Sequence, residues 1–163
     1  MLPEPPLTIQ PLGDGDAEAL LDFYRSLSEA VARDFLPVGV VAPDTVSEHL
    51  ALVRDGVCLS LGLFDSSGRI LGHGFIQGLD TPRPMLGIGL HDDVIGQGYG
   101  RQIMERLIAE SDSRGVPALM LNVVKTNTRA ERLYASLGFV RTGQATFRIR
   151  NDSWAMERRR PRA

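Results

Sequence analysis

The pattern of apolar and polar positions predicts strands and helices in alternation. Apolar residues three and four apart predict amphipathic helices at 16–31, 45–53, 101–114 and 128–137. Short β-rich runs predict strands at 7–12, 57–64, 69–79, 85–90 and 118–124, a strand beginning at 139, and a final hairpin of 145–150 with 153–157. The stretch 32–43 contains two prolines and no clean period, which predicts a loop or broken helix. This order predicts an α/β (α+β) fold in a single domain covering 1–163.

One stretch combines a strand, a glycine-rich turn and a helix in immediate succession. Gly96, Gly98 and Gly100 stand between the apolar run 86–90 and the amphipathic run that begins at Ile103. Such a turn leaves main-chain N–H groups unpaired at the positive end of a helix, where a phosphate binds well. The alternative is a tight turn that needs glycines only for its own dihedral angles. Ile103 replaces the last glycine of a dinucleotide fingerprint, and the only lysine, Lys125, is too distant for a P-loop.

Composition and charge narrow the class of protein. The 163 residues are 43% hydrophobic and 23% charged, which is typical of a globular chain. The single cysteine, Cys58, cannot form an internal disulfide, and no signal peptide or membrane span is evident, so we expect a cytoplasmic protein. The near-neutral net charge of −2 argues against nucleic acid as a partner.

The charge is divided unevenly along the chain. Residues 1–80 hold 12 acidic and 4 basic side chains, and residues 81–163 hold 8 and 14. The glycine loop therefore lies in a half with a net charge of +6, as expected if that half binds a polyanionic small ligand. The basic residues 158–163 are expected to form a disordered tail.

Two segments resemble the GNAT superfamily of acyl-CoA-dependent N-acetyltransferases. The run 95–100, IGQGYG, is similar to the family's R/Q-x-x-G-x-G/A loop. The run LNVVKTNTRAERLYASLGF is similar to the pattern N-x-x-A-x-x-L-Y-x-x-x-G-F, with Asn127, Ala130, Leu133, Tyr134, Gly138 and Phe139 in register. The motifs fall within residues 85–142, and the first half matches only in element order.

The resemblance implies a fold and a co-substrate. It implies a central mixed, mostly antiparallel sheet of about six to seven strands, splayed in the middle and flanked by about four helices. It also implies acetyl-CoA, with the diphosphate on the N–H groups of residues 97–101 and the pantetheine arm between strands 85–90 and 118–124. The implied contacts are Leu90, His91, Gln97, Gly98, Tyr99, Gly100, Arg101, Asn127, Ala130 and Tyr134. Unpaired main-chain groups at Leu90 and His91 are expected to meet the pantetheine arm, and Asn127 has helix capping as an alternative role.

By its family position, Tyr134 is the candidate catalytic residue. When an amine attacks the thioester, CoA leaves as a thiolate that needs a proton, and a phenol held close to the sulfur can donate it. The alternative is a tyrosine that only packs in the core, since Tyr134 lies on the apolar face of its helix.

The chain departs from the family at two positions. Ile95 replaces the Arg or Gln that begins the loop, and Arg101 is a candidate substitute. Asn122 stands where some members carry a glutamate, so no general base is assigned. His73 is a candidate base, although a lone strand histidine is more often structural. The histidine spacing suggests no metal site.

These residues together predict transfer of an acetyl group to a primary amine by direct attack in a ternary complex. The acceptor is expected to contact Phe35, His73 and Arg148, and it is either a small molecule or a protein amine. Two alternatives stay open: a non-catalytic acyl-CoA-binding module, and a transferase of a longer acyl group. Homodimers are common in the family, so a homodimer is one state to test.

Overall fold

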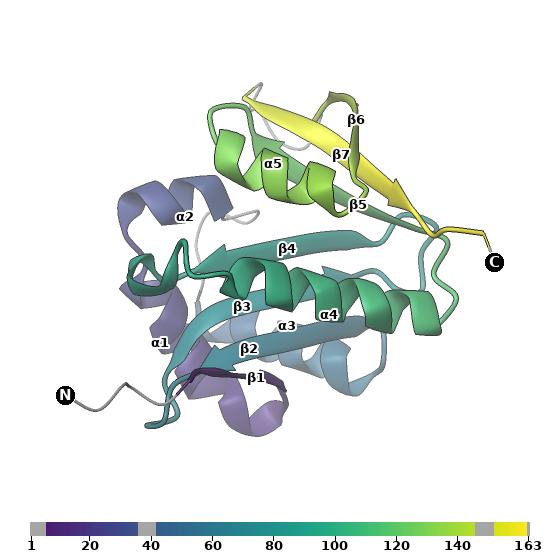
Figure 1. Ribbon diagram of the computed structural model, residues 1–163. Coiled ribbons are helices and arrows are strands. Elements are labelled where there is room, and N and C mark those ends of the chain that lie inside the picture. The colour runs from purple at the N-terminus through teal and green to yellow at the C-terminus, as the bar shows by residue number, and fades with distance from the viewer. Residues whose placement is uncertain (1–5, 36–41, 146–151, 163) are drawn as a thin grey trace.

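The computed structural model describes residues 6–35, 42–145 and 152–162. They form one seven-stranded sheet in the order β1-β2-β3-β4-β5-β7-β6 (Figure 1). Every neighbouring pair is antiparallel except β4 and β5, which are parallel. The strands are β1 (Thr8–Pro11), β2 (Cys58–Phe64), β3 (Ile70–Gln77), β4 (Met85–Leu90), β5 (Ala118–Val124), β6 (Val140–Gln144) and β7 (Ser153–Arg159). The predicted mixed, mostly antiparallel sheet is confirmed.

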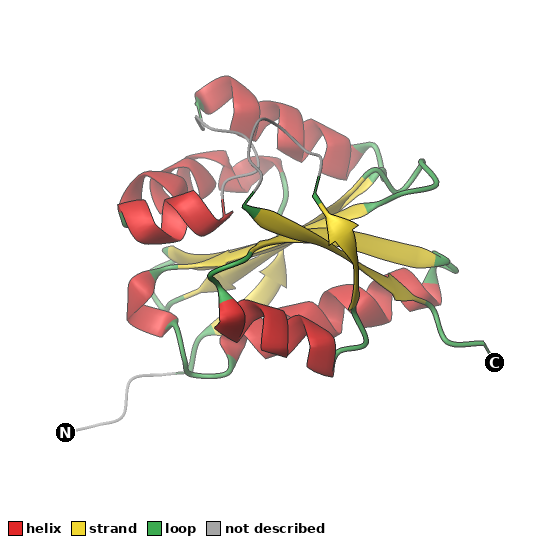
Figure 2. Ribbon diagram, turned by 90° about the horizontal axis from the view of Figure 1, so that it is seen from above, coloured by secondary structure: helices red, strands yellow, loops and turns green. Residues whose placement is uncertain are grey.

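Helices cover both faces of this sheet. Figures 1 and 2 show α1 (Ala17–Ser26), α2 (Glu29–Phe35) and α3 (Pro43–Arg54) on one face, and α4 (Tyr99–Ser113) and α5 (Thr128–Ser136) on the other. Short 3-10 turns lie at Asp14–Asp16 and Asp92–Val94. Four helices were expected, and the predicted helix 16–31 is in fact two, because α1 ends at Ser26 and α2 begins at Glu29 and runs into the stretch predicted as a loop or broken helix. No helix in the described ranges is long and apolar enough to cross a bilayer.

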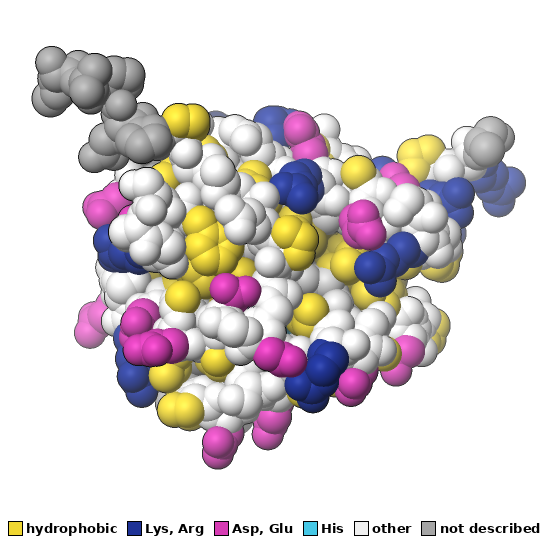
Figure 3. All heavy atoms as spheres, turned by 90° about the horizontal axis from the view of Figure 1, so that it is seen from below, with side chains coloured by type: hydrophobic (Ala, Val, Ile, Leu, Met, Phe, Trp, Pro, Cys, Tyr) yellow, Lys and Arg dark blue, Asp and Glu magenta, His cyan; other side chains and the backbone are white. Residues whose placement is uncertain are grey.

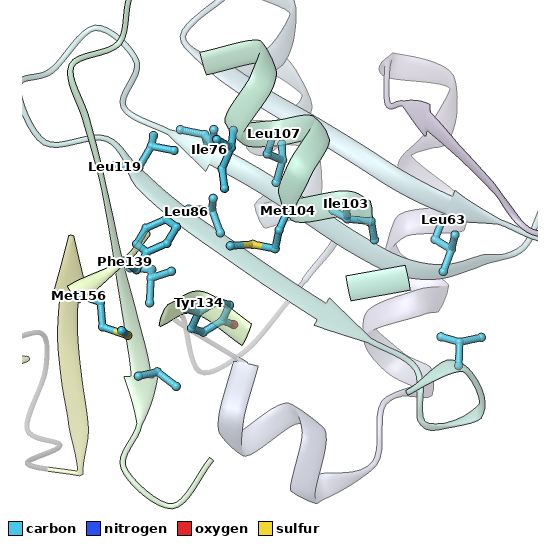
Figure 4. Packing of buried hydrophobic residues seen from close by; sticks show 14 of the residues in the cluster. Leu63, Ile76, Leu86, Ile103, Met104, Leu107, Leu119, Tyr134, Phe139 and Met156 are labelled. Atoms are coloured by element: carbon cyan, nitrogen blue, oxygen red, sulfur yellow. The ribbon is translucent and has the colours of Figure 1, made fainter. Parts of the chain in front are cut away.

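The core consists of two clusters, one on each face of the sheet. Leu20 and Phe23 of α1 pack with Val46 and Leu50 of α3 and with Ile70. On the other face, α4 lies so close to β3 that Gly74 has no room for a side chain, because a Cβ there would lie 2.4 Å from Ile103 Cγ2. Figure 4 shows this larger cluster, which extends from Leu63 past α4 to Tyr134, Phe139 and Met156.

Helix α3 starts two residues before the predicted start, and α5 starts at the predicted residue. Helix α3 begins at Pro43, which has no main-chain N–H to lose, and the hydroxyl of Thr45 accepts the Ala42 N–H at 3.4 Å. Helix α5 is capped by Asn127, whose Oδ1 accepts the Ala130 N–H at 3.2 Å, and Thr128 is the first helical residue.

The C-terminal segment is also more ordered than expected at its start. Arg158 and Arg159 belong to β7, and Arg158 forms two 3.1 Å bonds with the carboxylate of Asp112 in α4. A disordered tail starting at residue 158 is therefore wrong for these two residues. Figure 3, a view from below, shows acidic side chains scattered over this face and basic side chains beside the C-terminus. Most of the predicted strand 145–150 lies outside the described residues.

The sheet opens between β4 and β5. A single residue pair, Met85 with Met120, joins them, and the Met120 N–H donates to the Pro84 carbonyl at 2.9 Å. Beyond this point the strands diverge, which confirms the predicted splay in the middle of the sheet (Figure 1). The opening positions the candidate site.

Candidate active site

A cleft of about 980 Å³ fills the opening between β4 and β5. Its lining residues come from elements on both faces of the sheet. On the face of α4 and α5 it is lined by Gly96, Gly98, Gly100, Arg101, Asn127, Arg129, Ala130, Leu133 and Tyr134. On the face of α2 it is lined by Val31, Phe75, Gln77, Arg83 and Met85, with Thr142, Gln144 and Ser153 from the edge of β6 and β7.

The glycine loop forms one end of the cleft. Gly96 and Gly98 have φ angles of +85° and +90°, a left-handed conformation that strains any residue with a Cβ. Gly98 caps α4, so the first-turn N–H groups of Tyr99, Gly100 and Arg101 have no intrahelical partner. These donors and the helix dipole make this end of the cleft suitable for an anion.

Two predicted loop contacts lie outside the lining of the cleft. The Gln97 side chain donates to the Asp93 carbonyl at 2.9 Å, and it does not reach the cleft. The Tyr99 ring packs against the core cluster. For Gln97 and Tyr99, only the main-chain groups are therefore placed to contact a ligand bound at the glycine loop.

The N-terminus of α5 forms a second positive end beside the loop. Asn127 lines the cleft, and its side-chain oxygen already accepts the capping hydrogen bond from Ala130. Arg101 joins the two helices, because its Nη2 donates to the Ser136 hydroxyl at 2.9 Å and its Nη1 lies 3.9 Å from Glu105. Arg129 faces the cleft from the first turn of α5.

Tyr134 lies on α5 where the two strands separate (Figure 4). Its side chain is 8% exposed, and its ring meets Phe139 edge-on with centroids 6.2 Å apart. Within the described part of the chain its hydroxyl has no hydrogen-bond partner. Every fully buried side-chain oxygen among the described residues has a partner, so the Tyr134 oxygen is not fully buried and is open to the cleft. Burial raises the pKa of this phenol to about 12, which keeps it protonated at neutral pH.

The register of β4 decides which main-chain groups point into the cleft. The His91 N–H donates to the Leu71 carbonyl at 2.8 Å, which turns it toward β3. Main-chain N–H and C=O groups alternate in direction along an antiparallel pair, so those of Leu90 and Ile88 point the other way, toward β5. The His91 carbonyl accepts the Val94 N–H at 3.0 Å. The expectation of unpaired groups is therefore wrong for His91, whose N–H and C=O are both used within the fold.

Of the three predicted acceptor contacts, only the side chain of His73 lies in the described residues, and it is outside the cleft. His73 is 2% exposed and lies between the sheet and α1, where Nδ1 is 2.6 Å from the Tyr24 hydroxyl and Nε2 is 2.7 Å from Ser60 Oγ. Burial lowers the pKa of His73 well below 6.5. His73 therefore has the structural role that was the alternative to a general base. Phe35 ends α2 with its side chain outside the described residues, and Arg148 lies outside them entirely.

Several lining residues were missed by sequence reasoning. Gln77, Arg83 and Arg129 carry no motif, and their places depend on strand register and on the turn before β4. Among the described lining residues there is no Asp, Glu or His, and Asn122 presents an amide where a carboxylate was sought. The described ranges also contain no group of three or more His, Cys, Asp or Glu placed to hold a metal ion.

Comparison with known proteins places this geometry in a family. Residues 24–139 match the acetyltransferase (GNAT) family. The ribosomal protein bS18-alanine N-acetyltransferase of Escherichia coli K12 is 35% identical over 82 residues, which are 50% of this chain and 53% of that protein. The chain thus matches about half the length of such relatives.

Solved structures agree over nearly the whole chain. The ribosomal-protein-S5-alanine acetyltransferase from Vibrio fischeri has a TM-score of 0.80 at 15% identity, covering 98% of this chain and 96% of the other. The spermidine N-acetyltransferase from Vibrio cholerae, in complex with CoA and spermine, has a TM-score of 0.76 at 18% identity, with coverage of 94% and 95%. With a matching fold and a family match over residues 24–139, the chain belongs to the acetyltransferase (GNAT) family.

Proposed function

We propose that this protein transfers the acetyl group of acetyl-CoA to a primary amine by direct attack, with both substrates bound at once. The observation that carries the proposal is the cleft between β4 and β5, which has an anion-binding loop at one end, an open phenol inside and lining residues on the face of α2 as well as on the face of α4 and α5. The donor enters beside α4 and α5, and the acceptor enters from the face of α2.

The residues of the cleft divide the work. The N–H groups of the first turn of α4 bind the diphosphate, and the main-chain groups of Ile88 and Leu90 hold the pantetheine arm. Bound acetyl-CoA supplies a thioester whose carbonyl carbon forms a bond to the amine nitrogen as its bond to sulfur breaks. Tyr134 gives its proton to the leaving thiolate, and the proton that the attacking nitrogen loses passes to water, from which the phenolate is reprotonated. With its pKa raised to about 12, this phenol is protonated at neutral pH, as a proton donor must be.

The lining of the cleft favours an α-amine as the acceptor. A lysine-type amine, with a pKa of about 10.4, costs roughly 4–5 kcal/mol to deprotonate at neutral pH, whereas an α-amine near 8 costs about 1 kcal/mol. No carboxylate or imidazole among the described lining residues can take that proton or bind a polyamine's charge. The names of two similar proteins, which act on ribosomal protein alanine, support this class of acceptor.

A panel of acceptors tests the proposal. Thiol release from acetyl-CoA is measured with a short peptide that begins with a free alanine, with the same peptide N-terminally blocked and carrying one lysine, and with spermidine. We expect the free α-amine to react fastest, with mass spectrometry placing the acetyl group on the terminal nitrogen.

Each other outcome of the panel identifies a different function. Preference for lysine or spermidine would overturn the α-amine assignment. Binding of acetyl-CoA without thiol release for any amine would favour the non-catalytic module, to which the missing base points. Faster transfer from a longer acyl-CoA would replace acetyl as the donor group.

A further inference from the structure

We propose that Arg129 binds the diphosphate of CoA from above the glycine loop and supplies the cationic contact that the loop itself lacks. The proposal rests on the proposed function, because it assigns a further binding residue to the same cleft. At the first position of the loop, where an arginine or glutamine is usual, the chain has Ile95, which is apolar, 39% exposed and part of the cleft wall.

The guanidinium of Arg129 lies directly over the loop. A Cβ atom placed on Gly96 would be 2.6 Å from Arg129 Nη2 and 3.5 Å from both Cζ and Nη1. The absence of a side chain at position 96 is therefore what allows the guanidinium to approach the loop backbone. From this place its N–H groups can reach the anion that the first turn of α4 binds.

Arg129 is also in an electrostatically unfavourable place for a residue with only a structural role. It stands in the first turn of α5, where the helix dipole repels a cation. Helices α4 and α5 begin at the same end of the molecule (Figure 1), so a second positive helix end lies beside it. Among the residues that the structure describes, Arg129 has no hydrogen-bond or ion-pair partner. A bound anion would resolve this excess of positive charge.

Arg101, the substitute expected from the sequence, is already engaged. Its guanidinium donates to the Ser136 hydroxyl at 2.9 Å and lies 3.9 Å from the Glu105 carboxylate. These contacts orient it toward α5 and partly neutralise its charge. Of the two arginines that line the loop end of the cleft, Arg129 is the one whose donors are free.

The experiment measures binding of CoA, 3′-dephospho-CoA and pantetheine to the full chain by calorimetry. Arg129→Gln removes the charge, Arg129→Lys keeps it, and Arg132→Gln is a matched control on the same helix, exposed and outside the cleft. We expect Arg129→Gln to weaken CoA and 3′-dephospho-CoA equally, by roughly 10- to 100-fold. Arg129→Lys should recover part of the loss, pantetheine should be unaffected, and Arg132→Gln should match the wild type.

The outcomes separate this inference from the proposed function. Equal CoA affinity in Arg129→Gln and the wild type would overturn the role of Arg129 and leave the donor site standing. A loss for CoA alone, and not for 3′-dephospho-CoA, would overturn the diphosphate assignment, because the contact would then be with the ribose phosphate. A larger loss in Arg101→Gln than in Arg129→Gln would return the role to Arg101. A wild-type protein that binds no CoA would reject the donor site itself.

Discussion

At the scale of single residues, the free hydroxyl of Tyr134 distinguishes a reactive tyrosine from a packing one. A tyrosine that served only the core would direct its hydroxyl to a protein acceptor, because an unpaired buried hydroxyl is costly. Here the ring is packed against Phe139 while the oxygen is open to the cleft. The phenol is therefore held in place by its apolar part and keeps its proton available.

Replacing Tyr134 with phenylalanine tests this role. We expect turnover to fall by about 10²-fold or more, since the thiolate then leaves without a positioned acid. The dissociation constant of acetyl-CoA and the melting temperature should change little, because the hydroxyl makes no hydrogen bond within the described residues. Steady-state kinetics, calorimetry and a thermal melt measure the three quantities. Unchanged turnover would reject Tyr134 as the acid.

At the scale of elements, a chain of buried hydrogen bonds joins α1, α3, β2 and β3. It runs from the Tyr24 hydroxyl to His73 at 2.6 Å, from His73 to Ser60 at 2.7 Å and from Ser60 to His49 at 2.9 Å. Cys58 Sγ lies 3.9 Å from the second nitrogen of His49. The bonds can all be satisfied with both imidazoles neutral, with the donors pointing either from Tyr24 toward Cys58 or in the reverse direction. Burial lowers the pKa of both histidines, that of His49 to about 4.

The free energy of unfolding is therefore expected to decrease in mild acid. Below pH 6.5 the two imidazoles are protonated in the unfolded chain but stay neutral in the folded one. Their contribution to the free energy of unfolding is therefore complete above this pH and is lost as the pH falls toward 4. For His49 alone the loss between pH 7.5 and 5 is about 2 kcal/mol. Urea unfolding at several pH values measures it.

A variant at the same site separates the histidines from other acid effects. His49→Gln should be less stable at pH 7.5, because it disturbs the buried chain of bonds, but its stability should depend less on pH between 7.5 and 5. Carboxylates whose pKa is lowered, such as Asp65 and Glu131, titrate below this window. A wild-type protein with constant stability from pH 7.5 to 5 would contradict the prediction.

At the scale of the whole molecule, the sheet consists of two parts, β1 to β4 and β5 to β7, paired at one position. The main-chain groups of Ile88 and Leu90 face the gap and not a neighbouring strand. We expect CoA to slow hydrogen exchange at these two amides, because its pantetheine arm accepts from one edge of the gap. Amides in the β2–β3 pair, already bonded on both sides, should not change. Hydrogen exchange measured by mass spectrometry with and without CoA tests this prediction. Equal protection of β4 in the two states would place the pantetheine arm elsewhere.

Much of this molecule could be predicted from the sequence, because local patterns determine local structure. The strand 85–90, the glycine turn and the helix after it follow from periodicity and glycine spacing, and they form the anion-binding end of the cleft. The mixed, mostly antiparallel sheet and its splay do not follow from periodicity, and they came from resemblance to a family.

What failed depends on contacts between distant segments. The paired N–H of His91 depends on its register with Leu71, and the burial of His73 depends on which face of β3 meets α1. The position of Arg129 above Gly96 joins residues that are 33 positions apart, and no local pattern reports it. Helix α2 was missed because its first residues, 29–31, were joined to the predicted helix 16–31, and the prolines at 37 and 43 indicated a loop for the rest.

The single point of contact between β4 and β5 makes the donor a structural brace. A donor molecule bound there would connect β1 to β4 with β5 to β7. The melting temperature would then rise with the fraction of protein that has donor bound. By mass action, a donor at a hundred times its dissociation constant adds about 2.7 kcal/mol to the folded state. Removal of the donor would then lower the melting temperature as well as stop the reaction.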